Sequence, residues 1–238
     1  MANPKSKIPN PQLTFLVSAG PTIEDLDPVR FISNRATGKL GVAIARTALR
    51  RGHQVILIHG PLPDAVRSTI PSARGCTSVP VRSAADMHRA VMRHVASANV
   101  VIMNAAVADY TPARKAGTKL KKSKRALVLR LKATVDILAA LGELKRRRRK
   151  DLVLIGFALE TGSGGTEFQR KQSRLAAARS KLRAKNLDAI VLDTPSAMGA
   201  EKSAFTVVLP EGAARHFASA SKARIARIVV KLAAGWCY

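Results

Sequence analysis

Short apolar runs alternate with amphipathic segments along the chain, and this alternation restricts the possible folds more than any other feature. The apolar runs cover residues 13–20, 54–60, 98–110, 126–132, 151–160, 187–193 and 204–210. Apolar residues recur with a helical period at 38–51, 83–97, 135–144, 167–185 and 219–233. Buried strands separated by helices form a mostly parallel sheet that is covered on both faces. The pattern therefore predicts a doubly wound α/β fold.

The length of 238 residues suits a single large domain with a sizeable core. Residues 1–12 contain three prolines and no periodic pattern, so we predict a flexible tail there and one domain over 13–238. Ser83 followed by Asp86 is typical of a helix N-cap, and Gly52 is typical of a residue that ends a helix. Residues 21–37 combine two prolines with mixed polarity and predict a long loop.

Positive charge is concentrated in one part of the chain. The 41 Lys and Arg residues against 15 Asp and Glu give a net charge of +26, and residues 112–150 hold fifteen of the basic residues with two acidic ones. We therefore predict an inserted basic arm or lid over 111–150. Such a balance favours polyanionic partners: nucleic acid, nucleotides, phosphorylated metabolites or an anionic membrane.

Several classes of protein are excluded by what the sequence lacks. It has no run of about 18 apolar residues, so we expect no transmembrane helix and no membrane partner. The first residues lack the apolar stretch of a secretory signal, and Cys76 and Cys237 do not form a disulfide framework, which favours the cytoplasm. An aromatic content of 4% is too low for a stacking platform on single-stranded nucleic acid. Walker A, HExxH, CxxC and GxSxG motifs are absent, and the histidines form no ligand pattern.

The polar segments after the apolar runs hold the candidate binding residues, because ligands of doubly wound sheets sit beyond the carboxyl ends of strands. The first such segment lacks the GxGxxG fingerprint of dinucleotide-binding proteins. Its residues 33–39 lead into a predicted helix, whose N-terminal N–H groups suit a phosphate or carboxylate. An Asn or Thr cap on an ordinary helix is the alternative. Arg30 can bind such an anion with two nitrogens, or it is a solvated loop residue.

Later segments carry the other candidates. Asp109 can accept a hydrogen bond from a ribose or hold hydrated Mg²⁺, or it caps a loop. The lysines of KLKK (119–122) can fold over a triphosphate, although lysine runs are also common on solvated surfaces. Phe157 can stack on a base or belong to the core. Lys181 and Lys185 lie four residues apart on one helix face and can bind phosphates together.

Together these segments resemble one family, the phosphopantothenate–cysteine ligases, also called phosphopantothenoylcysteine synthetases. The resemblance rests on ISNRATGKLG, AAVADY followed by KLKK, GFALE and ARSKLRAKNLDAIV, in an order and spacing that match from about Leu13 to Val208. It implies a Rossmann-like homodimer of coenzyme A synthesis, here without the flavin-dependent decarboxylase domain that is fused to it in many bacteria. It also implies Mg²⁺ and CTP, or ATP as in eukaryotic relatives. The nucleotide activates 4′-phosphopantothenate as an acyl-nucleotidyl anhydride, which the cysteine amine then attacks.

The resemblance also assigns roles to single residues. It implies that Asn34 and Lys119 are catalytic, and that Arg30 and Asn34 bind the phosphopantothenate carboxylate and the intermediate. The implied nucleotide-binding residues are Ala105, Asp109, Lys119, Phe157, Lys181 and Lys185. The family has Asn-Pro-Asp where this chain has Thr134-Val135-Asp136, and 192–194 and 199–204 also depart from the family, so the choice between CTP and ATP stays open.

Two other interpretations compete with this one. Residues 103–107, MNAAV, resemble the strand end of nicotinamide-dependent short-chain reductases, but those enzymes need Tyr-x-x-x-Lys, and here Arg114 follows Tyr110 at that spacing. The second interpretation is a degenerate ligase scaffold that binds nucleic acid through the basic arm. The run Arg146–Arg149 favours it, whereas the scarce aromatic residues and the lack of a nucleic-acid-binding motif oppose it.

Overall fold

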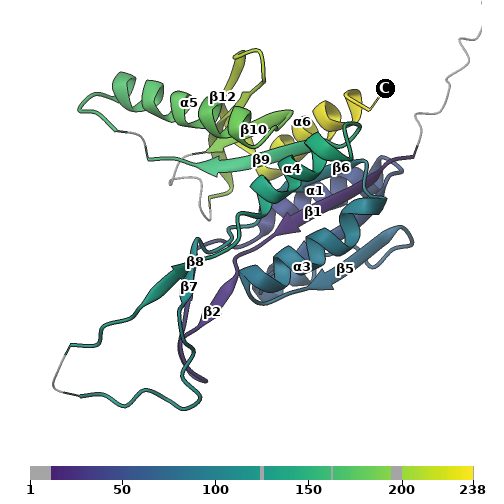
Figure 1. Cartoon of the computed structure of the whole chain (residues 1–238). Coiled ribbons are helices and arrows are strands. Elements are labelled where there is room, and N and C mark those ends of the chain that lie inside the picture. Colours follow the sequence, from purple (N-terminus) through teal and green to yellow (C-terminus); the bar gives the residue numbers. More distant parts are fainter. Residues whose placement is uncertain (1–11, 124–125, 162, 194–199, 238) are drawn as a thin grey trace, which may run out of the picture.

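An eight-stranded sheet forms the centre of the molecule (Figure 1). The computed structural model describes residues 12–123, 126–161, 163–193 and 200–237, so the tail predicted for residues 1–12 lies outside it except for Gln12. The strands lie in the order β12-β11-β10-β9-β6-β1-β4-β5. Their bounds are β1 Thr14–Ala19, β4 Gln54–His59, β5 Cys76–Pro80, β6 Val100–Met103, β9 Val153–Leu159, β10 Ala189–Asp193, β11 Lys202–Val208 and β12 Ala214–Ser221.

The order of the strands reverses between β1 and β6. From β1 the chain builds outward through β4 to β5, and it then returns to the other side of β1 with β6, β9 and β10, all of them parallel. Loops at the carboxyl ends of β1 and β6 therefore diverge. The antiparallel strands β11 and β12 extend the sheet at one edge. The predicted doubly wound, mostly parallel fold is confirmed.

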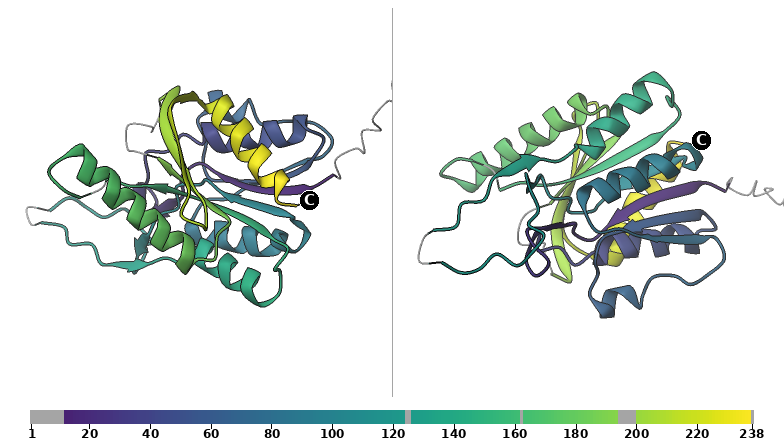
Figure 2. Two further views of the ribbon diagram at one scale, coloured as in Figure 1. Left: turned by 90° about the horizontal axis from the view of Figure 1, so that it is seen from above. Right: turned by 60° about the horizontal axis from the view of Figure 1, so that its bottom comes forward.

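Helices cover both faces of the sheet (Figure 2). The helices are α1 Lys39–Arg50, α2 Asp64–Arg67, α3 Ala84–His94, the 3₁₀ turn η1 Val95–Ser97, α4 Ile137–Arg147, α5 Glu167–Ala184 and α6 Lys222–Gly235. α1 and α6 pack on one face over Phe15, whereas α3, α4 and α5 cover the other face over Leu16. These successive residues of β1 belong to different cores because side chains alternate across a strand. No helix in the described residues is long and apolar enough to cross a membrane.

The local signals for helix ends act as predicted. The Ser83 hydroxyl accepts a hydrogen bond from the Asp86 N–H (3.1 Å), and the Asp86 carboxylate accepts one from the Ser83 N–H (2.9 Å), so α3 begins with a capping box. Gly52, just past α1, has φ +84°, the left-handed conformation that a glycine at this position adopts readily.

Two short hairpins project from the carboxyl side of the sheet (Figure 1). β2 (Ile23–Asp25) pairs with β3 (Phe31–Ser33), where the sequence predicted only a loop. β7 (Tyr110–Pro112) pairs with β8 (Leu131–Ala133) in the basic region. Three-residue strands carry too little apolar alternation to be recognised in the sequence. We call residues 113–123, which follow β7, the lysine segment.

The basic arm predicted for 111–150 is too long. Residues 137–147 form α4, whose Ile137 and Leu141 are buried in the core, so the excursion from the sheet ends before this helix. The predicted strand at 126–132 is reduced to β8. The helical period of 135–144 predicted a helix here, and the burial of its apolar face shows that α4 packs against the central sheet and is not part of the arm.

Much of the arginine run is engaged within the molecule. Arg146 and Arg147 pair with a glutamate of their own helix. Arg149 donates hydrogen bonds of 2.9 Å to the carbonyl oxygens of Ala96 and Ala98. Carbonyl groups in and just after η1 therefore find donors on the segment after α4, which ties the ends of α3 and α4 together.

Two strands that lie at the edges of the sheet were absent from the sequence prediction. In β5 and β12 most side chains are exposed or half-buried, unlike those of β6, which are all buried. An edge strand needs no continuous apolar run, so the period-based prediction overlooked both.

Gly142 on α4 provides a test of this packing. A Cβ atom added there would lie 2.0 Å from the carbonyl oxygen of Lys185, at the end of α5. We expect Gly142→Ala to reduce the free energy of unfolding by about 1–3 kcal/mol through overpacking, as measured by urea denaturation. Gly235→Ala is the control, because nothing lies within 4 Å of that added atom, and it should change stability by less than about 0.5 kcal/mol. Equal stabilities of the two variants would contradict the close approach of α4 to Lys185.

Candidate functional site

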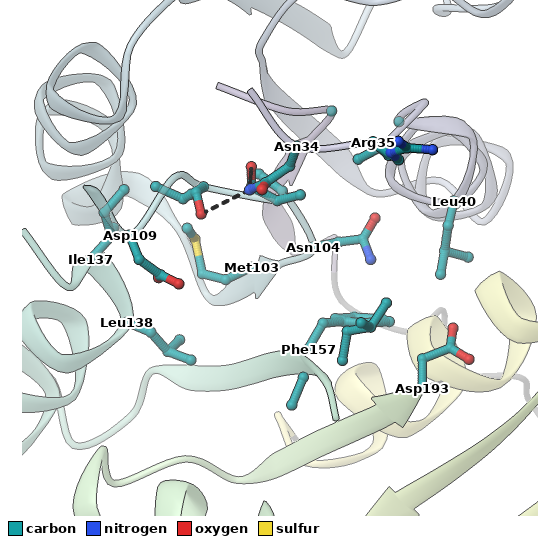
Figure 3. A pocket seen from close by; sticks show the side chains of 18 of the residues that line it. Asn34, Arg35, Leu40, Met103, Asn104, Asp109, Ile137, Leu138, Phe157 and Asp193 are labelled. Atoms are coloured by element: carbon teal, nitrogen blue, oxygen red, sulfur yellow. Dashed lines mark hydrogen bonds between the residues drawn. The ribbon is translucent and has the colours of Figure 1, made fainter. Parts of the chain in front are cut away.

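A cavity of about 750 Å³ opens at the carboxyl ends of β1, β6, β9 and β10. It lies where the strand order reverses, the usual ligand position in this class of fold. Its volume is that of a typical small-molecule site. Four stretches supply most of its wall: 33–40, 103–109, 134–138 and 157–159. Figure 3 shows Asn104, Asp109, Phe157 and Asp193 arranged around the opening.

The N-terminus of α1 forms one wall. Gly38, which precedes the helix, has φ +76° and no capping side chain, and the first turn contains no acidic residue. Gly38 also lies close to Gly20, since an added Cβ would come within 3.1 Å of the Gly20 nitrogen. A helix that begins uncapped at a cavity presents N–H groups to an anion, as the sequence suggested for 33–39.

Asn34 links two walls of the cavity. Its side-chain nitrogen donates to the carbonyl oxygens of Ala106 (3.0 Å) and Val107 (3.2 Å), and Figure 3 marks a hydrogen bond of this residue. The loop beyond is held further by the Thr134 hydroxyl, which donates to the Ala108 carbonyl oxygen at 2.6 Å. Asn34 therefore sets the distance between the α1 wall and the loop after β6.

Three lysines of the cavity are each paired with a carboxylate. Lys39 lies 2.6 Å from Glu201, Lys185 lies 2.7 Å from Asp136, and Lys181 pairs with Glu160. The pair with Lys39 lowers the pKa of Glu201. Burial alone would raise the pKa of Asp136, but the bond from Lys185 and backbone N–H groups lower it below its usual range. The carboxylates of Glu201 and Asp136 therefore stay ionised near neutral pH, and an anionic ligand must displace a carboxylate at each of the three lysines.

The cavity brings together most of the predicted site residues. Asn34, Ala105, Asp109, Phe157, Lys181 and Lys185 all line it. Lys222, at the start of α6, also lines it, although no sequence pattern singled it out. β11 and β12 run antiparallel to each other, so the chain comes back to the carboxyl ends of the parallel strands before α6 begins. A local sequence pattern cannot reveal this return.

Arg30 and Lys119 do not line the cavity of the chain that carries them. Arg30 pairs with Asp27 at 2.6 Å and donates to the carbonyl oxygen of Leu120, also at 2.6 Å. Lys119, next to that residue, is exposed on the lysine segment. The turn that precedes β3 and the lysine segment are thus in direct contact, beside the cavity and outside its wall.

The sequence matches a known family. Residues 11–235 match the DNA/pantothenate metabolism flavoprotein C-terminal domain. The coenzyme A biosynthesis bifunctional protein CoaBC of Bacillus subtilis (strain 168) is 40% identical over 212 residues, which are 87% of this chain and 47% of that protein. A cysteine/cysteine sulfinic acid decarboxylase from an unknown prokaryotic organism is 36% identical over 219 residues, 90% of this chain and 56% of that protein. The chain spans about half the length of these curated relatives.

Solved structures have the same fold. The crystal structure of the C-terminal domain of the coenzyme A biosynthesis bifunctional protein CoaBC has a TM-score of 0.73 and 34% identity, with 95% of this chain and 97% of that chain covered. A DNA/pantothenate metabolism flavoprotein from Streptococcus pneumoniae has a TM-score of 0.77 and 23% identity, with 94% and 99% covered. The second likeness concerns the fold alone.

The paired lysines lead to a test with inorganic triphosphate. Glu160→Gln removes the carboxylate that neutralises Lys181, so we expect inorganic triphosphate to bind about two- to fivefold more tightly in low-salt calorimetry. Lys181→Ala should weaken the same binding. Glu211→Gln makes the same charge change in the exposed turn between β11 and β12, which lies beyond the start of β10 and not at the carboxyl ends of the parallel strands, and it should leave the affinity unaltered. An equal gain in both glutamine variants would mean that net charge alone attracts the anion.

Proposed function

Because this chain belongs to the family of the DNA/pantothenate metabolism flavoprotein C-terminal domain, we propose that it joins cysteine to 4′-phosphopantothenate in coenzyme A synthesis. One observation carries the proposal. Six residues from four distant stretches, each matched by the resemblance to the ligases, line one cavity at the strand-order reversal. The 40% identity to a coenzyme A biosynthesis protein supports the same pathway. We place the reaction in the cytoplasm, where the two free cysteines of the chain would remain reduced.

The proposed reaction has two steps. The phosphopantothenate carboxylate attacks the α-phosphorus of CTP or ATP, which forms an acyl-nucleotidyl anhydride and releases pyrophosphate. The cysteine amine then attacks the acyl carbon, the new C–N bond forms, and the nucleoside monophosphate leaves. Lysines that neutralise phosphate charge assist the first step, and a neutral donor that orients the activated carboxyl assists the second.

The six cavity residues that the resemblance assigns to the site each have a role in this scheme. Lys181 and Lys185 exchange their carboxylate partners for nucleotide phosphates. Phe157 lies beside the base, and Asp109 accepts from the ribose, with the nucleotide against the backbone at Ala105. Asn34 gives up one of its hydrogen bonds to the loop carbonyl oxygens and donates to the activated carboxyl group instead. Arg30, which the resemblance assigns to the carboxylate and the intermediate, stays in this role as part of the proposal.

We propose that Mg²⁺ binds together with the nucleotide. The described residues contain no group of three or more His, Cys, Asp or Glu side chains placed to hold a metal ion. Mg²⁺ typically needs only one or two carboxylates when phosphates complete its shell, and Asp109 and Asp193 both line the cavity. Bound there, the ion would neutralise and orient the phosphates.

Single-turnover kinetics can separate the roles of Asn34 and Lys119. Lys119→Ala should slow pyrophosphate release, because the ammonium no longer offsets phosphate charge. Asn34→Ala should let the acyl-nucleotide accumulate and slow amide formation by about 10²–10³. Asn34→Asp should be slower still, since its carboxylate opposes both the anionic intermediate and the carbonyl oxygens of the loop.

The control is Lys150→Ala, which removes an exposed lysine beyond α4 and should leave both steps unchanged. If neither the Asn34 nor the Lys119 variants release pyrophosphate, the two residues do not divide the steps in this way. If the Asn34 and the Lys119 variants all react at the wild-type rate, these residues do not take part in the reaction and the cavity has another function.

We further propose a homodimer in which the two hairpins form the interface. They expose large apolar side chains, namely Val29, Phe31, Tyr110, Leu127, Val128, Leu129 and Leu131. Isolated two-stranded hairpins are marginally stable in water, and closed two-fold dimers are the commonest oligomers. Lys119 lies outside the cavity of its own chain, and the adjacent residue Leu120 is hydrogen-bonded to Asp27. We therefore propose that Lys119 acts in the cavity of the second copy.

Co-expression of Lys119→Ala and Asn34→Ala chains tests this arrangement. Random pairing gives half mixed dimers, each with one intact and one doubly altered site, so total activity should return to about one quarter of wild type. If each cavity uses its own Lys119, every site carries one lesion and activity stays at the level of the single variants. Light scattering should give a mass of two chains at both low and high salt.

A further inference from the structure

Asp27 is a buried carboxylate outside the cavity that accepts five hydrogen bonds. It is 1% exposed. One oxygen accepts from the N–H groups of Val29 and Arg30, each at 2.8 Å. The other accepts from two side-chain nitrogens of Arg30, at 3.0 and 2.6 Å, and from the N–H of Leu120 at 3.0 Å. All of its donors are therefore local except one, which comes from a residue 93 positions away.

Leu120 is held at both of its backbone polar groups. Its N–H donates to Asp27, and its carbonyl oxygen accepts a 2.6 Å hydrogen bond from Arg30. A planar guanidinium can bind the Asp27 carboxylate and this carbonyl oxygen at the same time, which a lysine ammonium cannot do with the same geometry. The contact fixes a residue between two lysines of the KLKK sequence, Lys119 and Lys121.

Two further contacts hold the lysine segment on the same turn. The Ala116 N–H donates to the Leu26 carbonyl oxygen at 2.9 Å, and Lys115 pairs with Asp25 at 2.8 Å. Hydrogen bonds from Arg82 and Lys115 lower the pKa of Asp25 to about 2. The segment is therefore attached at three points, and Asp27 is the fully buried side chain among the residues that hold it.

We infer that Asp27 is a positioning residue, which together with Arg30 binds the backbone of Leu120 and thereby fixes the location of Lys119. The inference rests on the role proposed for Lys119 in the ligase reaction. Asp27 touches no residue of the cavity wall in the described contacts, so its effect on turnover passes through the two groups that it holds, Arg30 and the lysine segment. Without this contact the segment keeps only its attachments at Lys115 and Ala116, and the ammonium of Lys119 samples many positions.

A neutral side chain of the same shape cannot replace Asp27. Burial alone would raise its pKa, but the bonds from Arg30, Leu120 and Val29 outweigh burial and hold the pKa well below its usual range. In Asp27→Asn the new side chain would direct an amide nitrogen toward one set of donors, so it would lose two or three of the five hydrogen bonds. We therefore use Asp27→Asn as the principal test.

The test combines hydrogen exchange with a double-mutant cycle. In Asp27→Asn, amide exchange in the lysine segment should rise about tenfold or more, whereas peptides from α1 and β4 keep their protection. Pyrophosphate release should slow by up to about 100-fold through a fall in kcat. In a Lys119→Ala background the same change should slow the reaction by less than about threefold, because the residue that Asp27 positions is absent.

Asp64→Asn is the matched control. It breaks an aspartate–arginine pair with the same spacing and the same 2.6 Å distance on the exposed helix α2, and it should alter neither exchange in the lysine segment nor turnover. Additive effects of Asp27→Asn and Lys119→Ala would overturn the inference. Slow turnover with unchanged exchange in the segment would overturn it as well.

Arg30→Lys provides a second variant in case Asp27→Asn does not fold. It keeps the charge next to Asp27 but cannot reach Leu120 at the same time, so exchange in the lysine segment should again increase. A purely substrate-binding arginine would leave that exchange unchanged. If wild-type protein releases no pyrophosphate, the proposed function fails, and the exchange data alone support or overturn the attachment of the segment by Asp27.

Discussion

The reversal of strand order between β1 and β6 is the constraint on which the rest of this molecule depends. Chain segments that leave these two strands turn in opposite directions, so neither fills the space beyond the sheet. Strands buried on both faces hold mostly apolar side chains, so most polar side chains collect past the strand ends. The same topology thus creates the cavity and supplies its polar wall. Asn34 then sets how far apart the two diverging loops stand.

Three lysines of the cavity hold their positive charge in paired form, although the chain carries a net charge of +26. Lys39, Lys181 and Lys185 each contact a carboxylate, so ligand binding exchanges one anion for another. A ligand with one phosphate gains little from such an exchange, because it replaces a group of similar charge. A polyphosphate that reaches several lysines at once gains from each of them without a further loss of translational freedom. Pairing therefore favours long polyanions over short ones.

Sequence patterns predicted the elements that form the core and most of the residues that line the cavity. Continuous apolar runs or a helical period indicate β1, β9 and α1, and Ser83 with Asp86 indicates the start of α3. The edge strands β5 and β12 give no such pattern because they bury few side chains. The predicted arm is too long because the charge of this region indicates solvent exposure, whereas the apolar period of α4 determines its burial. Arg30 suggested an anion ligand, and its contact with Leu120 depends on a pairing across 90 positions that no local pattern contains.

The two hairpins differ from the cavity in what keeps them in place. The cavity wall rests on strands and helices with fully buried cores, whereas β2, β3, β7 and β8 have three residues each and expose apolar side chains. Ribbons of this size are marginal without a partner surface. Asp27 binds one hairpin to the lysine segment, which lies between β7 and β8 of the other, so the two hairpins are joined into one unit. In the proposed dimer, a unit joined internally by a buried carboxylate and covered by a second copy would hold Lys119 at a defined point, which neither contact would achieve alone. The proposed arrangement would separate the lysine that meets the phosphates from the wall that binds the rest of the ligand, and the site would then be complete only after assembly.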